Sequence, residues 1–363
     1  MTIKILHVAK LSNNPFSGVC VVVPEHIRRQ SEFADVALLN INECSVNGFD
    51  EQFVYHGANW KDDVSSKYRK PDIVVFHEVY HIEYTKIARS LSRDGIPYII
   101  IPHGCLVGAA QRKKPLKKLL ANTFIFHGFI YHAAALQCLS HNELINTSFT
   151  IPKFIGTNGV SLPSVKKISF NKEVIKFIYI GRLEILPKGL DLLLQAVRRV
   201  DEIVLYKDLF TINIFGPDFK GRYEEVEKLI KQYNIGKIVK LNHELTGINK
   251  IKHLLDSDVF LQTSRHEGMP MGILEAMSYG IPCLITKGTS LGDITSKYDA
   301  GWVSETTVES IANMIVKAIQ ERNLLPEKSS NARKLILENF AWSHIVKSTI
   351  DSYKKYIDTK RDK

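Results

Sequence analysis

Cysteines and long apolar runs are both scarce in this chain of 363 residues. Its five cysteines are scattered and none pairs as C-x-x-C, which disfavours a disulfide framework and a zinc site. The longest apolar candidate, residues 124–139, is interrupted by polar residues and glycine and is short for a bilayer span. We therefore expect a cytoplasmic protein with reduced cysteines, in which residues 124–139 form a buried helix that runs into a strand.

Signature motifs of two common enzyme classes are missing. The chain has no G-x-G-x-x-G after a strand, which disfavours a classical dinucleotide oxidoreductase, and no G-x-x-x-x-G-K-[ST], which disfavours a P-loop NTPase. The pattern G-x-S-x-G, typical of the nucleophile turn of α/β-hydrolases, does occur, at residues 288–292 (GTSLG). The N-terminal MTIKILHVAK does not combine a basic region with an apolar stretch and a cleavage site, so we expect no signal peptide.

The charge balance is basic, with a formal net charge of +10. Nothing resembles a zinc finger, an RNP motif or a bZIP region, so we expect no nucleic-acid partner. Residues 111–120 fit a basic amphipathic helix on an anionic membrane surface, which would place the protein on the inner face of the cytoplasmic membrane. A solvated helix face fits this stretch as well. It interleaves Leu116, Leu119 and Leu120 with Arg112, Lys113, Lys114, Lys117 and Lys118.

Apolar runs rich in β-branched residues and bounded by Gly and Pro indicate buried parallel strands. They alternate with helical stretches in two series, which indicates two doubly wound sheets. We therefore predict an α/β protein with two Rossmann-like domains that face each other across a deep cleft. The first series is 3–9, 72–78, 97–104, 136–140 and 153–160, and the second is 174–183, 209–217, 237–243, 258–264 and 281–286.

The polar, Pro-containing stretch 161–172 is expected to link the two domains. We place the N-terminal domain at residues 1–165 and the C-terminal domain at 170–342. The last helix, at about 343–363, is expected to pack back on the N-terminal domain.

A DSD triplet at residues 256–258 could hold a divalent metal on a diphosphate. However, Asp258 directly precedes the apolar run VFLQ, which favours the start of a strand. We expect neither a metal nor another cofactor.

Two cations flank a loop in the second series. Arg182 follows the strand IYIG, and Lys188 stands six residues later at the start of a helix. At the carboxyl end of a strand, such a pair can neutralise a diphosphate. Taken alone, the pair is more often a pair of solvated loop cations.

The segment 264–280, SRHEGMPMGILEAMSYG, supplies a complementary part. A turn containing Gly268 and Pro270 leads into a helix whose amides and dipole favour an anion. Glu267 and Glu275 would repel a phosphate, so they are expected to accept hydrogen bonds from neutral hydroxyl groups. A diphosphate with hydroxyl-rich groups on both sides is a nucleotide-sugar.

This segment resembles the E-x7-E signature of retaining glycosyltransferases of the GT-B fold, the family-4 type of glycosyl transferases group 1. The element GRLEILPKG at 181–189 resembles the Gly-Arg…Lys-Gly element of the same family. Five weaker matches stand in the expected order along nearly the whole chain: PHG (102–104), LSHNE (139–143), TNGV (157–160), FGP (215–217) and the helix that begins at Trp342.

The resemblance implies roles for particular residues. Glu267 would bind hydroxyls of the donor sugar, Glu275 would bind the ribose, and Arg182 with Lys188 would hold the diphosphate. His103 would face the reacting sugar. The expected nucleotide-sugar contacts also include Gly18, Gly216, Gly268, Met269, Pro270, Met271 and Gly272.

Three groups of side chains also fit purely structural roles. His103 could be a strand-end histidine bonded to backbone. His77 and Glu78 could belong to a solvated loop or to an acceptor pocket. Ser140 and Glu143 fit S-x-x-E, a capping box, which we favour.

The expected function is metal-independent, retaining transfer of a hexose-type sugar from a UDP- or GDP-sugar. The expected acceptor is a hydroxyl of a lipid-linked or surface-polysaccharide glycan of the O-antigen or capsule type. An NDP-sugar epimerase and a non-catalytic nucleotide-sugar-binding subunit are the alternatives.

Overall fold

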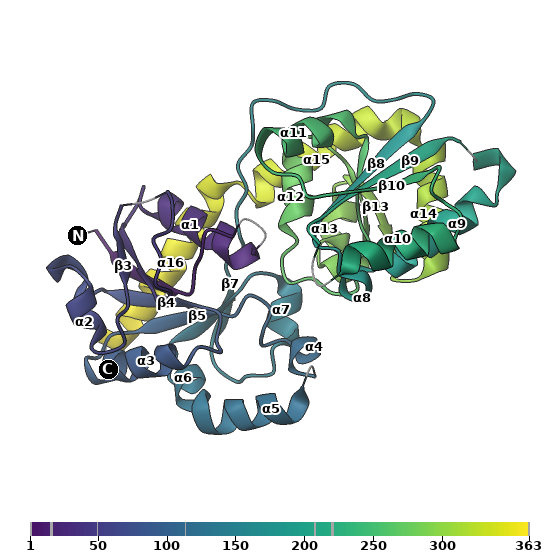
Figure 1. Ribbon diagram of the computed structural model, residues 1–363. Helices are drawn as coiled ribbons and strands as arrows, with labels where there is room; N and C mark the ends of the chain where they lie inside the picture. The colour runs from purple at the N-terminus through teal and green to yellow at the C-terminus, as the bar shows by residue number, and fades with distance from the viewer. Residues whose placement is uncertain are drawn as a thin grey trace. The chain divides into compact units, whose positions relative to one another are not determined.

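The computed structural model describes residues 2–14, 17–48, 50–112, 114–206, 208–218 and 221–361. Lys113, one of the basic residues named above, lies outside these ranges. The chain divides into two compact units, one made of residues 1–159 with 342–363 and the other of residues 160–341. Figure 1 shows one parallel sheet with flanking helices in each unit.

The first unit contains a seven-stranded sheet in the order β3-β2-β1-β4-β5-β6-β7, and all of its strand pairs are parallel. Its strands are β1 (Lys4–Ala9), β2 (Asp35–Asn40), β3 (Gln52–Val54), β4 (Ile73–His77), β5 (Tyr98–Ile101), β6 (Ala135–Cys138) and β7 (Lys153–Ile155).

The helices of the first unit include the last helix of the chain. This helix, α16, is yellow in Figure 1 and packs against α1. Its Tyr353 hydroxyl donates to Gln137 Oε1 at 2.7 Å. The α-helices are α1 (Gly18–Gln30), α2 (Trp60–Asp63), α3 (Ile82–Arg93), α4 (Gly108–Gln111), α5 (Pro115–Leu120), α6 (His127–Tyr131), α7 (His141–Asn146) and α16 (Trp342–Arg361); η1 (Ser66–Tyr68) is a 3₁₀ turn and η2 (Ala121–Ile125) a π-helical turn.

The second unit contains a six-stranded parallel sheet in the order β10-β9-β8-β11-β12-β13. Its strands are β8 (Ile175–Ile180), β9 (Phe210–Phe215), β10 (Val239–Asn242), β11 (Val259–Gln262), β12 (Cys283–Thr286) and β13 (Gly301–Ser304). Its helices are α8 (Ile185–Lys188), α9 (Leu190–Asp201), α10 (Arg222–Gln232), α11 (Gly247–Asp256), α12 (Met271–Ser278), α13 (Gly292–Lys297), α14 (Val308–Gln320) and α15 (Leu325–Asn339), with 3₁₀ turns η3 (Val204–Tyr206), η4 (Lys287–Thr289) and η5 (Arg322–Leu324).

Alternation along β8 builds a core on each face of the second sheet. Phe177 and Tyr179 pack in a cluster with buried residues of α9 and α14, whereas Ile178 packs with residues of α12 and α15. Successive side chains of a strand point to opposite faces, so a run that is apolar throughout must be covered on both sides. The predicted doubly wound α/β architecture is therefore confirmed for both units.

Both sheets reverse their strand order at one point, between β1 and β4 in the first and between β8 and β11 in the second. Ligands of open α/β sheets bind outside the carboxyl ends of the strands at such a switch point. This topology directs attention to the loops that follow these four strands.

The secondary structure differs from the sequence prediction in two ways. The strands β2, β3 and β13 were not predicted; β2 is as long as β1 but begins only a few residues after α1 ends. The buried helix expected within 124–139 is not continuous, because this stretch holds the end of η2, the short helix α6 and then β6. Within 124–139, Phe129 and Ile130 are buried as expected, but Phe124 is 78% exposed.

Candidate active site

Glu267 is held by three donors in the loop between β11 and α12. Its Oε1 accepts from Lys188 Nζ at 2.6 Å, from the Ser264 hydroxyl at 2.7 Å and from Gln262 Nε2 at 2.8 Å. The side chains of Lys188 and Glu267 are 16% and 15% exposed, so the ion pair is shielded but can be reached from solvent. The structure thus brings two predicted site residues together, and it adds Ser264 and Gln262, which sequence reasoning missed.

Gly189 sets the position of Lys188. Gly189 follows α8 with a φ of +64°, and a Cβ on Gly189 would overlap the backbone oxygen of Thr263. The Thr263 hydroxyl in turn donates to the Gly189 carbonyl at 3.0 Å. The loops after β8 and β11 therefore meet backbone to backbone across the switch point, which only glycine permits here.

A third loop supports Glu267 from the carboxyl end of β12. Glu267 N donates to the Gly288 carbonyl at 2.9 Å, and the Thr286 hydroxyl donates to the Ser264 carbonyl at 2.6 Å. A Cβ on Gly288 would overlap backbone atoms of Ser264 and Arg265. The glycine-containing stretch 286–293 thus braces the carboxylate-bearing loop.

Glu275 lies within α12, the helix that follows the Glu267 loop. Its Oε2 accepts from Lys250 Nζ of α11 at 2.5 Å, and the two side chains are 31% and 27% exposed. The E-x7-E carboxylates therefore each face a lysine from a different segment, Lys188 for Glu267 and Lys250 for Glu275. Only the tertiary structure could identify Lys250, because it is 25 residues from Glu275.

Arg182 is the most open of the predicted cations. Its side chain is 50% exposed and pairs with Glu184 at 3.2 Å, while its carbonyl accepts from the Tyr179 hydroxyl at 2.9 Å. Gly216, at the end of β9, packs on the end of β8, since a Cβ there would overlap the Gly181 carbonyl oxygen. Arg182 thus follows a tightly fixed strand end, while its long side chain extends into solvent.

The helix that carries Glu275 follows the turn that contains Gly268 and Pro270. α12 starts at Met271, and Pro270 is its capping residue rather than part of its first turn. Gly268 and Met269 remain in the loop that follows Glu267. A Cβ on Gly272 would lie 3.2 Å from the Phe260 ring, so this glycine lets α12 approach β11. The positive end of the α12 dipole directly follows the Glu267 loop.

His103 and Gly18 belong to the first unit. His103 follows β5 with a φ of +49°, and its Nε2 lies 3.0 Å from His77 Nδ1, so its partner is a side chain and not backbone. Burial lowers the pKa of His103 to about 4, and this effect outweighs the opposing charge of Glu78. Gly18 is the first residue of α1, with open space where a Cβ would lie.

His77 and Glu78 differ in their surroundings. His77 is fully buried, which rules out a solvated loop for it, whereas Glu78 has a φ of +68° and accepts from His81 Nε2 at 3.1 Å. Two non-glycine residues with left-handed backbone, Glu78 and His103, thus follow adjacent strands. Such strain persists where surrounding structure enforces it and gathers at functional sites.

Glu143 does more than cap a helix. The Ser140 hydroxyl accepts from Glu143 N at 3.1 Å, as expected for the N-cap of α7. The Glu143 carboxylate, however, accepts from Gly104 N at 2.6 Å and from Leu139 N at 2.7 Å, and so anchors the turn after His103. Burial raises the pKa of Glu143, and the two amides counteract part of this rise.

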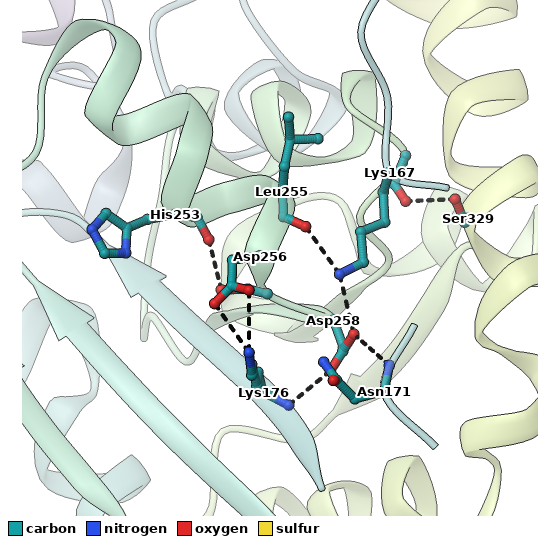
Figure 2. A network of polar contacts seen from close by, with 10 residues as sticks. Lys167, Asn171, Lys176, His253, Leu255, Asp256, Asp258 and Ser329 are labelled. Atoms are coloured by element: carbon teal, nitrogen blue, oxygen red, sulfur yellow. Dashed lines mark hydrogen bonds and ion pairs between the residues drawn. The ribbon is translucent and has the colours of Figure 1, made fainter. Parts of the chain in front are cut away.

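The DSD triplet lies at the opposite, amino edge of the second sheet. Asp258 is fully buried and accepts from Asn171 Nδ2 and from Lys176 N, both at 2.9 Å, while Lys167 Nζ lies 3.2 Å from its Oδ1 (Figure 2). The strand interpretation is therefore confirmed, because β11 begins at Val259. Within the ranges that the structure describes, no three His, Cys, Asp or Glu side chains are grouped as metal ligands would be.

Two parallel Rossmann-like sheets with these switch-point loops define the GT-B fold. The fold matches that of sucrose-phosphate synthase from Thermosynechococcus elongatus with a TM-score of 0.77 over 98% of this chain and 100% of that one, at 12% identity. Residues 163–335 match the family described as Glycosyl transferases group 1. This match lies within the second unit and covers slightly less than half of the chain.

Two curated relatives come from Escherichia coli. One is UDP-Gal:alpha-D-GlcNAc-diphosphoundecaprenol alpha-1,3-galactosyltransferase, which is 32% identical over 30% of this chain and 28% of its own length. The other is the O-antigen biosynthesis glycosyltransferase WbnH, which is 25% identical over 57% of each protein. The chain thus spans between about a quarter and three fifths of the length of these relatives.

Proposed function

We propose that the protein is a retaining glycosyltransferase that moves a hexose-type sugar from a UDP- or GDP-sugar to a hydroxyl of a lipid-linked or surface-polysaccharide acceptor. The observation that carries the proposal is the shielded Lys188–Glu267 pair at the switch point of the second sheet. A fixed cation beside a fixed carboxylate suits a ligand in which a diphosphate adjoins a hydroxylated ring.

In this proposal the bond between the anomeric carbon and the diphosphate oxygen breaks, and the acceptor oxygen bonds to the same face of that carbon. The acceptor proton passes to an oxygen of the leaving diphosphate, so no metal is required. Positive charge grows on the sugar and negative charge on the diphosphate. Arg182, Lys188 and the amino end of α12 would stabilise the diphosphate, while Glu267 and Glu275 would bind hydroxyls of the sugar and ribose.

The relatives support the donor and acceptor classes. The first carries a UDP-sugar and a diphosphoundecaprenol-linked sugar in its name, and the second is named for O-antigen biosynthesis. The comparisons give no support to the epimerase alternative.

Turnover of two variants tests the proposal. We expect Glu267→Ala and Lys188→Ala each to lower the transfer rate about a hundredfold or more, since one preorganised charge stabiliser contributes on the order of 3 kcal/mol. Glu202→Ala, which removes an exposed partner of Arg198, is the matched control and should retain full rate. Near-normal transfer by both site variants would reject the assignment. Nucleotide-sugar binding without turnover on any acceptor would instead support the binding-subunit alternative.

The donor can be identified by ligand-dependent stabilisation. UDP-glucose, UDP-galactose, UDP-N-acetylglucosamine and GDP-mannose form a suitable panel for thermal unfolding. A ligand at a hundred times its dissociation constant stabilises the folded protein by about 2.7 kcal/mol, so the true donor should stand out. The anomeric configuration of the product then tests retention directly.

An exposed surface of the first unit supports a membrane-borne acceptor. We call α5 and η2 together the apolar ridge, because Leu116, Leu119, Leu120 and Phe124 are 76%, 63%, 57% and 78% exposed. The expected continuous basic helix is not formed, since Lys114 has a φ of +60° and separates α4 from α5. Lys117 still flanks the ridge, whereas Lys118 turns back to the Ala110 carbonyl at 3.0 Å.

A cationic groove adjoins the ridge. It has a volume of about 680 Å³ and is shared by α3, which contributes Lys86, Arg89 and Arg93, and by Phe124 and Ile125 of the ridge. Among the described residues, none of these three cations forms an ion pair within the chain. We propose that the ridge enters the interface of an anionic bilayer while the groove holds lipid phosphates. None of the described helices is long and apolar enough to cross a membrane.

Sedimentation with phosphatidylglycerol-containing vesicles tests this surface. We expect the protein to bind these vesicles more than phosphatidylcholine vesicles. Leu116→Ser with Leu119→Ser, and separately Arg89→Glu with Arg93→Glu, should weaken binding. Ile248→Ser is the matched control, since Ile248 is 76% exposed but lies in the second unit. Equal binding by all variants would exclude this surface.

A further inference from the structure

Three histidines form a ladder across neighbouring strands of the first sheet. His7 lies within β1, His77 ends β4, and His103 stands two residues beyond the end of β5. In register, His7 is opposite Val75 and His77 is opposite Ile101. Each step to the next strand therefore moves two residues towards the carboxyl edge, which keeps all three side chains on one face.

The ladder is a continuous chain of hydrogen bonds. His7 Nδ1 lies 2.8 Å from His77 Nε2, and His77 Nδ1 lies 3.0 Å from His103 Nε2. At its inner end, His7 Nε2 lies 2.9 Å from Gln30 Oε1 of α1. Gln30, His7 and His77 are all fully buried, and His103 alone is partly exposed. The chain thus connects the interior of the unit to one residue at the carboxyl edge.

Burial keeps the three rings uncharged at neutral pH. It lowers the pKa of His7 to about 3, that of His103 to about 4 and that of His77 well below its usual value. The other titratable groups that act on the ladder are His26 of α1 and Glu78. Each neutral imidazole then has one N–H and one lone pair.

One proton per ring fixes the direction of the whole chain. The Gln30 carbonyl oxygen can only accept, so His7 donates from Nε2 and accepts at Nδ1. His77 must then donate from Nε2 and accept at Nδ1, and His103 must donate from Nε2. We propose that His7 and His77 are positioning residues that hold His103 as its Nε2–H tautomer, so that His103 Nδ1 is a fixed acceptor for a sugar hydroxyl.

This inference rests on the proposed function for the identity of the hydroxyl ligand, but the tautomer itself does not depend on that function. Within the described part of the chain, His103 Nδ1 has no hydrogen-bond partner, so its lone pair is available to a ligand. The anchoring of Gly104 by Glu143 fixes the backbone beside the ring. His77 is the central member of the ladder, because it is the only one that bonds to both other histidines.

The nitrogen resonances of ¹⁵N-histidine-labelled protein test the tautomer without any ligand. His103 is assigned by its loss in His103→Asn among the 13 histidines of the chain. We expect a protonated Nε2 and an unprotonated Nδ1 at pH 7. In His77→Leu the fixed preference should be lost, whereas in His77→Asn the amide oxygen can replace His77 Nδ1 as the acceptor and should restore it.

Transfer kinetics provide the second readout, with the donor that the stabilisation panel selects. We expect kcat to fall at least about tenfold in His77→Leu, since a histidine in the wrong tautomer loses its role. KM for the donor should change little, His77→Asn should recover most of the rate, and the exposed His344→Asn should behave as wild type. Circular dichroism confirms that each variant is folded.

The two readouts separate the possible failures. A protonated Nδ1 on His103 in the wild type, or an unchanged tautomer in folded His77→Leu, overturns the inference whatever the activity proves to be. The expected tautomers combined with no glycosyl transfer by the wild-type protein would instead count against the proposed function alone. Normal kcat in a His77→Leu variant with a disturbed tautomer would show that the ladder does not serve transfer.

Discussion

The second sheet carries a carboxylate beside a lysine at the amino ends of its strands (the amino edge) and another such pair at the carboxyl ends (the carboxyl edge). The two pairs are built differently. At the amino edge, Asp258 is fully buried, and both of its oxygens accept hydrogen bonds (Figure 2). At the carboxyl edge, Lys188, Ser264 and Gln262 all converge on Oε1 of Glu267, whose side chain remains 15% exposed.

This difference separates a structural pair from a ligand site. A buried charge is tolerated when every oxygen is satisfied, and Asp258 meets this condition by tying the linker residues Lys167 and Asn171 to the start of β11. Glu267 is oriented by neighbours but keeps capacity to accept from a further donor. Partial satisfaction together with access is what a binding carboxylate requires.

The largest expected effect on stability is at the amino edge. Asp258→Ala should lower the free energy of unfolding by about 3–5 kcal/mol, because it leaves Lys167 buried without its counter-charge. Asp256→Ala is the matched control, since Asp256 is 65% exposed and pairs with Lys176 at 3.1 Å; its loss should be below about 1 kcal/mol. Urea unfolding measures both, and equal losses would contradict the distinction drawn between the two carboxylates.

A methyl group at Gly189 should disturb the carboxyl edge next most. In Gly189→Ala the new Cβ overlaps the Thr263 carbonyl, so we expect a loss of about 1–3 kcal/mol from backbone strain together with weaker nucleotide-sugar binding. Gly221→Ala has a similar φ of +72° but open space around its Cβ. Calorimetric binding should therefore fall in the first variant only; if the two behave alike, the contact with Thr263 is unimportant.

Glu267→Gln should change stability less than either of these. The amide keeps the size of the carboxylate, and Lys188 can still reach solvent, so the expected loss is within about 1 kcal/mol by urea unfolding. A loss as large as that of Asp258→Ala would mean that Glu267 is a structural charge and not a binding group.

Lys250→Met should have the smallest effect. It removes the partner of Glu275 in a partly exposed ion pair, where the interaction is worth at most about 1 kcal/mol, so nucleotide affinity should change by less than about fivefold. Titration calorimetry with UDP measures this change, and the exposed neighbour Lys252→Met is the control. A loss of a hundredfold would assign Lys250 a direct contact with the nucleotide.

Much of the fold could be predicted from the sequence, because buried parallel strands leave a local signal. The runs that became β1, β4 and β8 are largely apolar on both faces, as is typical of parallel strands that are covered by helices on both sides. β2 has as many residues as β1 but was missed because it follows α1 so closely. The continuous basic helix expected at 111–120 was wrong because Lys114 breaks it.

The site could be predicted in part, for a related reason. Glu267, Lys188 and Gly189 stand in local patterns at strand ends, so their neighbourhood could be inferred from spacing and from the family resemblance. Their exact partners could not. Lys250, Glu143 and Gly288 are ordinary residues in the sequence, and they meet Glu275, Gly104 and Glu267 only through the packing of distant loops.

The sequence by itself determined two doubly wound sheets and the segments that follow their central strands, because hydrophobic periodicity and glycine placement are local properties. The tertiary structure alone decided which charge is buried, which is accessible, and that His7, His77 and His103 form one chain. The physical reason is that burial and hydrogen-bond direction depend on strand register, which brings together residues such as His7 and His77 that are 70 positions apart in the sequence.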